Sequence, residues 1–362
     1  MNSLRNSPLK ALIGVDIPII QAPMAGGATT PALVAAVCEA GGLGCLGAGY
    51  MTATKIREDI RAVRQLTSRP FGVNLFVPDP LPPDTTLAAV AIRLLKRYHQ
   101  ELGLEAPELP NRFAEPFEEQ IEAVIDERVP VFSFTFGIPD KNILSELKHA
   151  GTVIIGTSTT VDEGRMLVDA GVDAIVAQGV EAGGHRGTFS GDIDDALLGL
   201  VALVPQLVDA VSVPVVASGG IMDARGIVAA LALGAVGAQL GTAFLTARES
   251  GINATYRREL LQAVDDKTQL TKAYSGRAAR GIQTRFMAEM AGRDSEIPPY
   301  PVQNALTRDL RQAAAKADRR EFLSLWAGQA AALAAEHPAG EFVKSLADEC
   351  DALLARLSGL TP

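Results

Sequence analysis

One glycine-rich segment of the sequence, which follows a short apolar run, holds residue types suited to catalysis. Residues 174–177 are apolar and lead into Gln178, and Gly183-Gly184 and His185 follow. The apolar run is typical of a strand covered on both faces, and the glycines let the backbone approach a flat ligand or adopt positive φ. His185 can bind or exchange a proton near neutral pH. We predict an active-site loop with His185 as its catalytic residue; the alternative is a structural histidine bonded within the loop.

The other charged and titratable residues point to structural roles. Glu181 and Arg186 lie in the same loop, where they are predicted to orient it by pairing their charges. His99, His149 and His337 lie in helical, charged surroundings and are predicted to be surface residues. The sequence has no His, Cys and carboxylate cluster at metal-ligand spacing, so we expect no metal site.

Two further glycine segments follow the last two predicted strands. They are Ser218–Ile221 and Gln239–Thr242, and a helix is predicted to begin at Asp223. Loops after the seventh and eighth strands of a TIM barrel commonly bind phosphate, and glycine backbone N–H groups, a helix start and a threonine hydroxyl are suitable donors. We predict a phosphate site; the alternative is that these glycines only turn the chain.

Two amide side chains and one glycine motif need separate interpretations. Asn74 and Gln178 each end a predicted strand, where an amide can contact the polar edge of a heterocycle or simply close a turn. The segment 42–47 matches the dinucleotide-binding pattern Gly-x-Gly-x-x-Gly, but a helix precedes it, whereas that motif follows a strand. We interpret it as a helix cap and a tight strand.

The strands that must carry these residues alternate regularly with helices. A doubly wound open sheet would explain part of this pattern, but eight β/α units favour a TIM (β/α)8 barrel. The predicted strands are Pro18–Ala25, Leu43–Leu46, Phe71–Phe76, Val131–Phe134, Thr152–Gly156, Ala174–Ala177, Pro214–Ser218 and Ala235–Leu240.

Two regions depart from the alternation. Residues 77–116 are proline-rich and contain a charged helical segment over Leu87–Leu102, which predicts an excursion from the barrel. After Phe244 no strand pattern is visible; helices are predicted over 248–265 and, as one long stretch, over 313–333. We therefore divide the chain into an FMN-binding barrel at 1–250 and a helical segment at 251–362 that completes the barrel and covers its mouth, with the FMN assignment depending on the resemblance described below.

Composition limits the class of protein and its partners. The chain is 48% hydrophobic with a net charge of −9, which supports a large core and makes nucleic acid or an anionic membrane an unfavourable partner. The N-terminus lacks the apolar region of a signal peptide, and 227–245 divides into a helix and a strand instead of one membrane span. Three cysteines without a disulfide pattern favour the cytoplasm. Oligomeric state is not predicted.

Taken in order, these segments resemble the nitronate monooxygenase family, formerly called 2-nitropropane dioxygenases. The resemblance covers nearly the whole chain, and the loop around His185 is its most specific part. The segments that carry it are Gln21-Ala-Pro-Met-Ala-Gly-Gly27, Asn74-Leu-Phe76, Gln178-Gly-Val-Glu-Ala-Gly-Gly-His-Arg-Gly187, Ala217-Ser-Gly-Gly-Ile221, Gln239-Leu-Gly-Thr242, Tyr300-Pro301 and Phe322-Leu-Ser-Leu-Trp-Ala-Gly328.

The resemblance implies an FMN-dependent TIM-barrel enzyme that oxidises alkyl nitronates with O₂ to carbonyl compounds and nitrite through a flavin semiquinone. It implies that His185 contacts substrate as the catalytic residue and that Tyr300 lines the substrate pocket. Protonated His185 would hold an anionic nitronate, and neutral His185 would remove the α-proton of a nitroalkane. The residues implied to contact FMN are Met24, Asn74, Gln178, Gly183, Gly219, Gly220, Gln239, Leu240, Gly241 and Thr242.

Two other functions stay open from the sequence. A similar Gly-Gly-His loop occurs in the FMN- and NADH-dependent enoyl-acyl-carrier-protein reductase of some bacteria. The arginine after His185 and the C-terminal segment with Tyr300 and Trp326 favour the monooxygenase. The third possibility is a barrel that binds FMN or another phosphate ligand without turnover.

Overall fold

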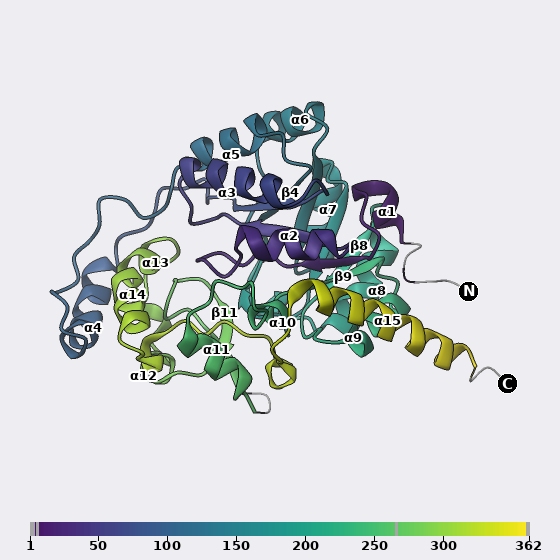
Figure 1. Ribbon diagram of the computed structural model, residues 1–362. Coiled ribbons are helices and arrows are strands. Elements are labelled where there is room, and N and C mark those ends of the chain that lie inside the picture. Colours follow the sequence, from purple (N-terminus) through teal and green to yellow (C-terminus); the bar gives the residue numbers. More distant parts are fainter. Residues whose placement is uncertain (1–3, 5–6, 265–266, 360–362) are drawn as a thin grey trace.

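The computed structural model describes residue 4 and residues 7–264 and 267–359. Within these ranges, eight parallel strands close into a barrel, with β1 paired to both β2 and β9 (Figure 1). The predicted TIM barrel is confirmed, and this closure excludes the open sheet. The barrel strands are β1 (Ile19–Gln21), β2 (Leu43–Gly47), β3 (Gly72–Phe76), β4 (Val131–Thr135), β5 (Val153–Ser158), β6 (Ala174–Gln178), β8 (Val215–Ser218) and β9 (Gly237–Leu240).

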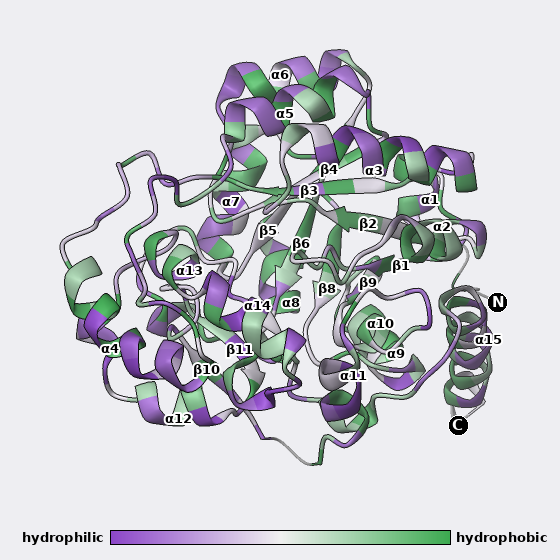
Figure 2. Ribbon diagram, turned by 60° about the vertical axis from the view of Figure 1, so that its left-hand side comes forward, coloured by the Kyte–Doolittle hydropathy of each residue, from purple (hydrophilic) through white to green (hydrophobic). Residues whose placement is uncertain are grey.

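The strands are apolar throughout because both of their faces are buried. In β6, Ala174 and Val176 point into the barrel interior, whereas Ile175 and Ala177 pack against the surrounding helices. Figure 2 shows the hydrophobic strands at the centre and hydrophilic faces on the outer helices. Those helices are α2 (Pro31–Glu39), α3 (Ala53–Leu66), α5 (Phe117–Asp126), α6 (Lys141–His149), α7 (Val161–Ala170), α8 (Leu200–Ala210), α9 (Ala224–Ala232) and α15 (Ala339–Ser358).

Short polar side chains begin several of these helices, as the sequence indicates. The hydroxyl of Thr30 accepts from the backbone N–H of Leu33 at the start of α2, and Asp223 caps α9 in the same way. The glycines of segment 42–47 serve helix packing, because a Cβ on Gly44 would lie 2.6 Å from the Cα of Val34 in α2. Their interpretation as a tight strand is confirmed.

Within the described residues before β4, two helices were not predicted. In α5, Phe117, Ile121 and Val124 cover β3 at helical spacing, but neighbouring glutamates obscure this periodicity in the sequence. The shorter α1 (Pro8–Ile13) buries Leu9 against the barrel interior, and its six residues are too few to give a periodic signal.

The excursion at 77–116 packs against the C-terminal segment rather than the barrel. Its helix α4 (Ala88–Glu101) buries Tyr98 against Phe286 and Phe322, far along the chain. On the outer side, Arg285 and Arg319 both pair with Glu101. The remaining described helices outside the outer ring of the barrel are α10 (Thr242–Leu245), α11 (Ala254–Leu261), α12 (Arg285–Met290), α13 (Val302–Leu306) and α14 (Arg308–Lys316), and the 3-10 turns are η2 (Asp194–Ala196), η3 (Asp294–Glu296), η4 (Arg320–Phe322) and η5 (Ala331–Leu333).

The expectation that no strand follows Phe244 is wrong. An antiparallel sheet in the order β10-β11-β7 contains β10 (Thr268–Thr271), β11 (Ala279–Ile282) and β7 (Gly184–His185). The sequence signal is weak because these strands are short and because Arg280, a buried residue of β11, donates to the carbonyl oxygens of Val180 and Thr268.

The long helix predicted over 313–333 is also wrong. After α14 the chain turns at Asp318, which has a φ of 53°, and Trp326 forms a β-bridge with Gly281. Residue 328 must be a glycine because its backbone packs directly on the loop that carries His185. A Cβ at this position would be 2.8 Å from the carbonyl oxygen of Glu181. Of the helix predicted over 248–265, only α11 forms within the described residues, and its predicted end at Asp265 lies outside them.

The domain division near residue 250 stays a prediction. One buried cluster joins residues on both sides of that boundary, from Leu4 to Cys350, and α15 packs on α2 and α9 at the eighth helix position of the barrel. All three cysteines are buried and free. Among the helices that the structure describes, none combines the length and the apolar character that crossing a membrane requires.

Candidate active site

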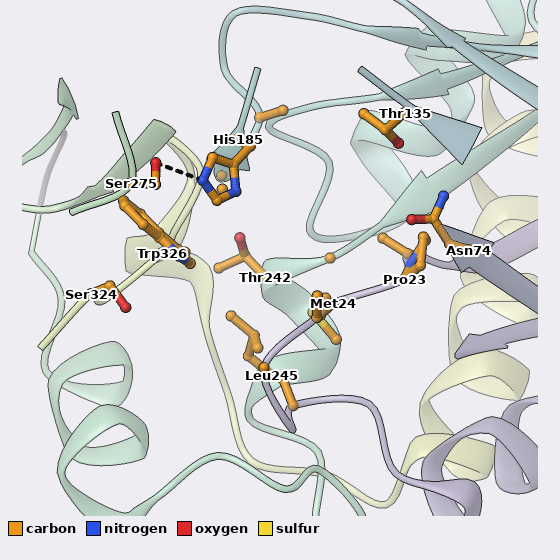
Figure 3. Close-up of a pocket in the computed structure, with 18 of the residues that line it drawn as sticks. Pro23, Met24, Asn74, Thr135, His185, Thr242, Leu245, Ser275, Ser324 and Trp326 are labelled. Atoms are coloured by element: carbon orange, nitrogen blue, oxygen red, sulfur yellow. Dashed lines mark hydrogen bonds between the residues drawn. The ribbon is translucent and has the colours of Figure 1, made fainter. Parts of the chain in front are cut away.

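A cavity of about 650 Å³ opens where the barrel strands end and the small sheet covers them (Figure 3). Two of the predicted site residues do not line it. Leu240 is buried in the barrel wall, and the ring of Tyr300 packs against Phe136 at 5.6 Å, with its centroid 6.3 Å from that of His185. The predicted residues that do line the cavity are Met24, Asn74, Gln178, Gly183, His185, Gly219, Gly220, Gln239, Gly241 and Thr242.

The ends of β8 and β9 present backbone donors to this cavity. Gly219 and Gly220 have φ values of 135° and 65°, which other residues rarely adopt. Among the described residues, none accepts a hydrogen bond from the N–H of Gly219 or Gly220. A Cβ on Gly241 would find only ordinary contacts, at 3.5 Å or more. These features fit an anionic group held by main-chain donors.

The amide of Gln178 is engaged within the protein and holds the loop that carries His185. Its Nε2 donates to the carbonyl oxygen of His185 at 3.0 Å, and its Oε1 accepts from the N–H of Gly187 at 2.8 Å. Pairing of β7 with β11 places His185 opposite Ala279. Asn74 differs, since its Nδ2 donates to the hydroxyl of Ser133 at 2.9 Å while its side-chain Oδ1 has no partner among the described residues.

The predicted charge pairing of Glu181 with Arg186 is wrong. The Glu181 carboxylate accepts from the N–H of Leu200 at 2.8 Å, where the start of α8 offers unpaired donors. Arg186 is 1% exposed and forms no ion pair with any described carboxylate. Its guanidinium donates to the carbonyl oxygens of Gly179 at 2.6 Å, Ala196 at 2.9 Å and Gln178 at 3.1 Å. Both residues therefore fix the loop through backbone contacts.

Sequence reasoning missed Glu163, a fully buried carboxylate of α7 that holds the far end of the same loop. It accepts from Thr159 and from the N–H groups of Phe189 and Ser190. No local sequence signal distinguishes it from the exposed acidic residues of other helices.

His185 is enclosed by aromatic rings. Phe136 and Trp326 lie 5.6 Å and 5.5 Å from its ring centroid, and its Nε2 is 2.9 Å from the hydroxyl of Ser275. Burial, aided by the positive charges of Arg277 and Arg311, lowers its pKa from 6.5 to about 3. The ring is therefore neutral at pH 7, which argues against the role of a cationic anion binder and leaves a nitrogen lone pair able to accept a proton.

Three arginines that sequence reasoning missed surround the cavity. Arg277 lies 4.0 Å above the ring of Phe136, and Arg308 and Arg311 line the cavity from α14. Arg311 donates to the backbone and side-chain oxygens of Asn304, both at 2.9 Å. None of the three forms an ion pair with a described carboxylate. The cavity thus carries positive charge although the chain is acidic, and it favours an anionic ligand. The signal available in the sequence was the i,i+3 spacing of Arg308 and Arg311, which places both on one face of a helix.

The histidines predicted at the surface divide into one exposed and two enclosed residues. His149 is exposed, as predicted. His99 is only 3% exposed, because the inner face of α4 packs on the C-terminal segment, and its Nδ1 is 2.8 Å from the carbonyl oxygen of Glu105. His337 is partly buried, and its ring stacks on Phe342 at 3.8 Å. For these two the prediction is wrong.

The pKa of His185 predicts an acid-sensitive stability. Between pH 6.5 and 3 the unfolded chain binds a proton at this position and the folded chain does not, so acidification favours unfolding. We expect this residue to lower the free energy of unfolding by about 1.4 kcal/mol for each pH unit below 6.5. Urea unfolding at several pH values gives the free energy of unfolding as a function of pH. Between pH 6.5 and 3, the slope of that dependence should be smaller in His185→Asn by about 1.4 kcal/mol per pH unit. An unchanged slope would contradict a His185 that is neutral in the folded protein, and His149→Asn is the matched control.

Comparison with known proteins identifies the family. A family model described as nitronate monooxygenase matches residues 6–349. The chain belongs to this family. Over 96% of its length it is 44% identical to a probable nitronate monooxygenase of Staphylococcus aureus (strain Newman) and 46% identical to one of Staphylococcus haemolyticus, covering 98% of each relative. These relatives make the chain an enzyme of the oxidoreductase class.

Solved structures agree with membership of the nitronate monooxygenase family. A nitroalkane oxidase from Streptomyces ansochromogenes superposes with a TM-score of 0.90 at 43% identity, covering 96% of this chain and 99% of that one. FabK from Thermotoga maritima superposes with a TM-score of 0.78 at 30% identity, covering 98% and 99%. The family match includes both glycine segments, the loop of His185 and the segment containing Trp326.

Proposed function

We propose that this family member is an FMN-dependent nitronate monooxygenase, which oxidises alkyl nitronates with O₂ to carbonyl compounds and nitrite. The observation that carries the proposal is a single cavity that joins three features. These are the free backbone donors after β8, the neutral His185, and two lining arginines, Arg308 and Arg311, that have no carboxylate partner among the described residues. The backbone donors suit a cofactor phosphate. His185 suits a substrate with an acidic C–H bond, and the arginines suit the anion formed from it.

The cavity fits FMN in volume and in donor set. Its volume is within the range of about 300 to 1,000 Å³ that is usual for cofactor sites. Gly219, Gly220 and the lining residues Gln239, Gly241 and Thr242 would hold the phosphate. Met24, Asn74, Gln178 and Gly183 would lie along the ring system. When bound, FMN supplies the redox capacity for electron transfer from an electron-rich nitronate to O₂.

The protein groups then divide the work on the substrate. The positive field of Arg277, Arg308 and Arg311 attracts and orients the nitronate anion. Neutral His185 can instead accept the α-proton of a nitroalkane and so generate the nitronate in place. The ring of Phe136, which lines the cavity and has Tyr300 packed against it outside the lining, forms an apolar wall that limits access of water to the reacting carbon. A nitronate needs only the positive field, whereas a neutral nitroalkane needs the positive field and the base.

The direct test is an absorbance spectrum of the purified protein, followed by anaerobic addition of a small alkyl nitronate. We expect flavin bands that change on addition, and release of nitrite when air is readmitted. A protein that remains colourless after incubation with FMN would refute the proposal, and so would a flavin that does not respond to nitronate.

The second candidate is enoyl reduction with FMN and NADH. The observation that keeps it is the 30% identity with FabK over nearly the whole chain. Anaerobic NADH alone should then bleach the flavin rapidly, and nitronate should leave it unchanged. Bound flavin that responds to neither reagent would instead favour a binding barrel without turnover.

A further inference from the structure

Ser275 lies directly behind His185 in the cavity wall. It is 2% exposed, and its Oγ is 2.9 Å from Nε2 of His185, the contact drawn as a dashed line in Figure 3. It belongs to the turn between β10 and β11. The next residue, Gly276, has a φ of 80°, and a Cβ there would be 2.6 Å from the backbone nitrogen of Tyr300. The turn is therefore packed too closely to move without moving its neighbours.

The hydrogen bonds of this turn determine which partner donates to the other. The Ser275 hydroxyl has one proton and two lone pairs. Its proton is donated to the carbonyl oxygen of Arg277 at 3.0 Å, and one lone pair accepts from the backbone N–H of Arg277 at 3.3 Å. The remaining lone pair faces His185. Nε2 of His185 must then carry a proton, because an unprotonated Nε2 would face another acceptor.

The second ring nitrogen is left free for chemistry. Nδ1 of His185 has no partner among the described residues. In Figure 3 it points away from Ser275, to the side of the cavity where Thr242 and Met24 lie. A neutral imidazole with its proton on Nε2 has its lone pair on Nδ1, so the basic atom faces the cavity.

We propose that Ser275 is a positioning residue that fixes neutral His185 in the Nε2–H tautomer and thereby directs the basic Nδ1 to the substrate. Its kinetic consequence rests on the proposed function, but the tautomer itself does not. The opposite arrangement, with Ser275 donating to Nε2, would deprive the carbonyl oxygen of Arg277 of its hydroxyl partner and turn an N–H into the cavity. In that tautomer His185 could not accept an α-proton.

Nitrogen-15 NMR of histidine-labelled holoenzyme at neutral pH tests the tautomer without any substrate. The chain has four histidines, and loss of one signal set in His185→Asn assigns the residue. We expect a protonated Nε2 and an unprotonated Nδ1 in the wild type, and mixed tautomers in Ser275→Ala. Ser275→Thr keeps the hydroxyl and should restore the single tautomer.

A matched control is available on the protein surface. Ser145 lies beside His149 on the exposed side of α6, with Oγ 3.4 Å from Nδ1, so Ser145→Ala removes a serine next to a histidine outside the cavity. It should leave the His185 signals unchanged. A proton on Nδ1 of wild-type His185 would overturn the proposal even if Ser275→Ala failed to fold, and so would an Ser275→Ala variant with the wild-type tautomer.

Kinetics separate this proposal from the proposed function. Loss of one hydrogen bond to the base should lower kcat for a neutral nitroalkane about tenfold in Ser275→Ala, with little change for the matching nitronate. An equal loss for both substrates would indicate general damage and would count against a positioning role. A wild type inactive on both substrates would refute the proposed function, while the NMR result would still decide the role of Ser275.

Discussion

Replacing His185 with asparagine is expected to lower kcat for a neutral nitroalkane by about 100- to 10,000-fold, the usual contribution of a general base. The same variant should keep FMN and should retain most of its activity on the preformed nitronate. In the proposed function the neutral imidazole would accept the α-proton, whereas Arg308 and Arg311 of the cavity lining, with Arg277 beside them, would hold the anion. Parallel rates of nitrite release from matched nitroalkane and nitronate at pH 7 would measure the difference.

The outcomes of this experiment discriminate between two roles of His185. If protonated His185 held the anion, the nitronate reaction would suffer at least as much as the nitroalkane reaction, and the pKa lowered by burial would be mechanistically irrelevant. If neither rate changed, His185 would have no part in the mechanism. His149→Asn, on the exposed surface of α6, controls for the loss of a histidine as such.

The barrel could be predicted from sequence because its strands carry a local signal. A strand such as β6 is buried on both faces, so a short apolar run identifies it without knowledge of its partners. The elements that failed depend on distant partners instead. In β7 and β11 the ladder joins Gly184 to Arg280, about a hundred residues apart, and neither strand alternates. The alanines around Trp326 predict a helix there, yet its backbone forms a β-bridge with Gly281.

The site residues also divide into those with a local sequence signal and those that depend on distant partners. Residues that end barrel strands, such as Asn74 and Gln239, were predictable because the closed barrel brings strand ends together. Ser275 and Arg277 reach His185 only because the β10–β11 turn folds back over the barrel. Residue type alone does not show how an amide is engaged: Gln178 lines the cavity, and its amide also holds both sides of the His185 loop, so its predicted contact with a ligand stays a prediction.

The arginine that follows His185 illustrates how a motif residue can act without touching substrate. Arg186 lies behind the loop and connects the end of β6 to the 3-10 turn η2, through the carbonyl oxygens of Gln178, Gly179 and Ala196. Burial lowers its pKa to about 10, so the guanidinium stays charged at neutral pH without a paired carboxylate. A lone buried charge is costly, and it persists here because backbone oxygens from three positions solvate it.

Removing that guanidinium should therefore be one of the most destabilising single changes in the molecule. Arg186→Met is expected to lower the free energy of unfolding by about 3 kcal/mol, because three charge-assisted hydrogen bonds are lost and only part of this is offset by no longer burying a charge. Arg186→Lys should recover little, since an ammonium lacks the planar fork that reaches all three oxygens. Urea unfolding of the holoenzyme measures both, with Arg165→Met on the exposed face of α7 as control. If Arg186→Met had the same free energy of unfolding as the wild type, the contacts of Gln178 and Glu181 would be sufficient to hold the loop. Arg186 would then be expected to act in the reaction instead.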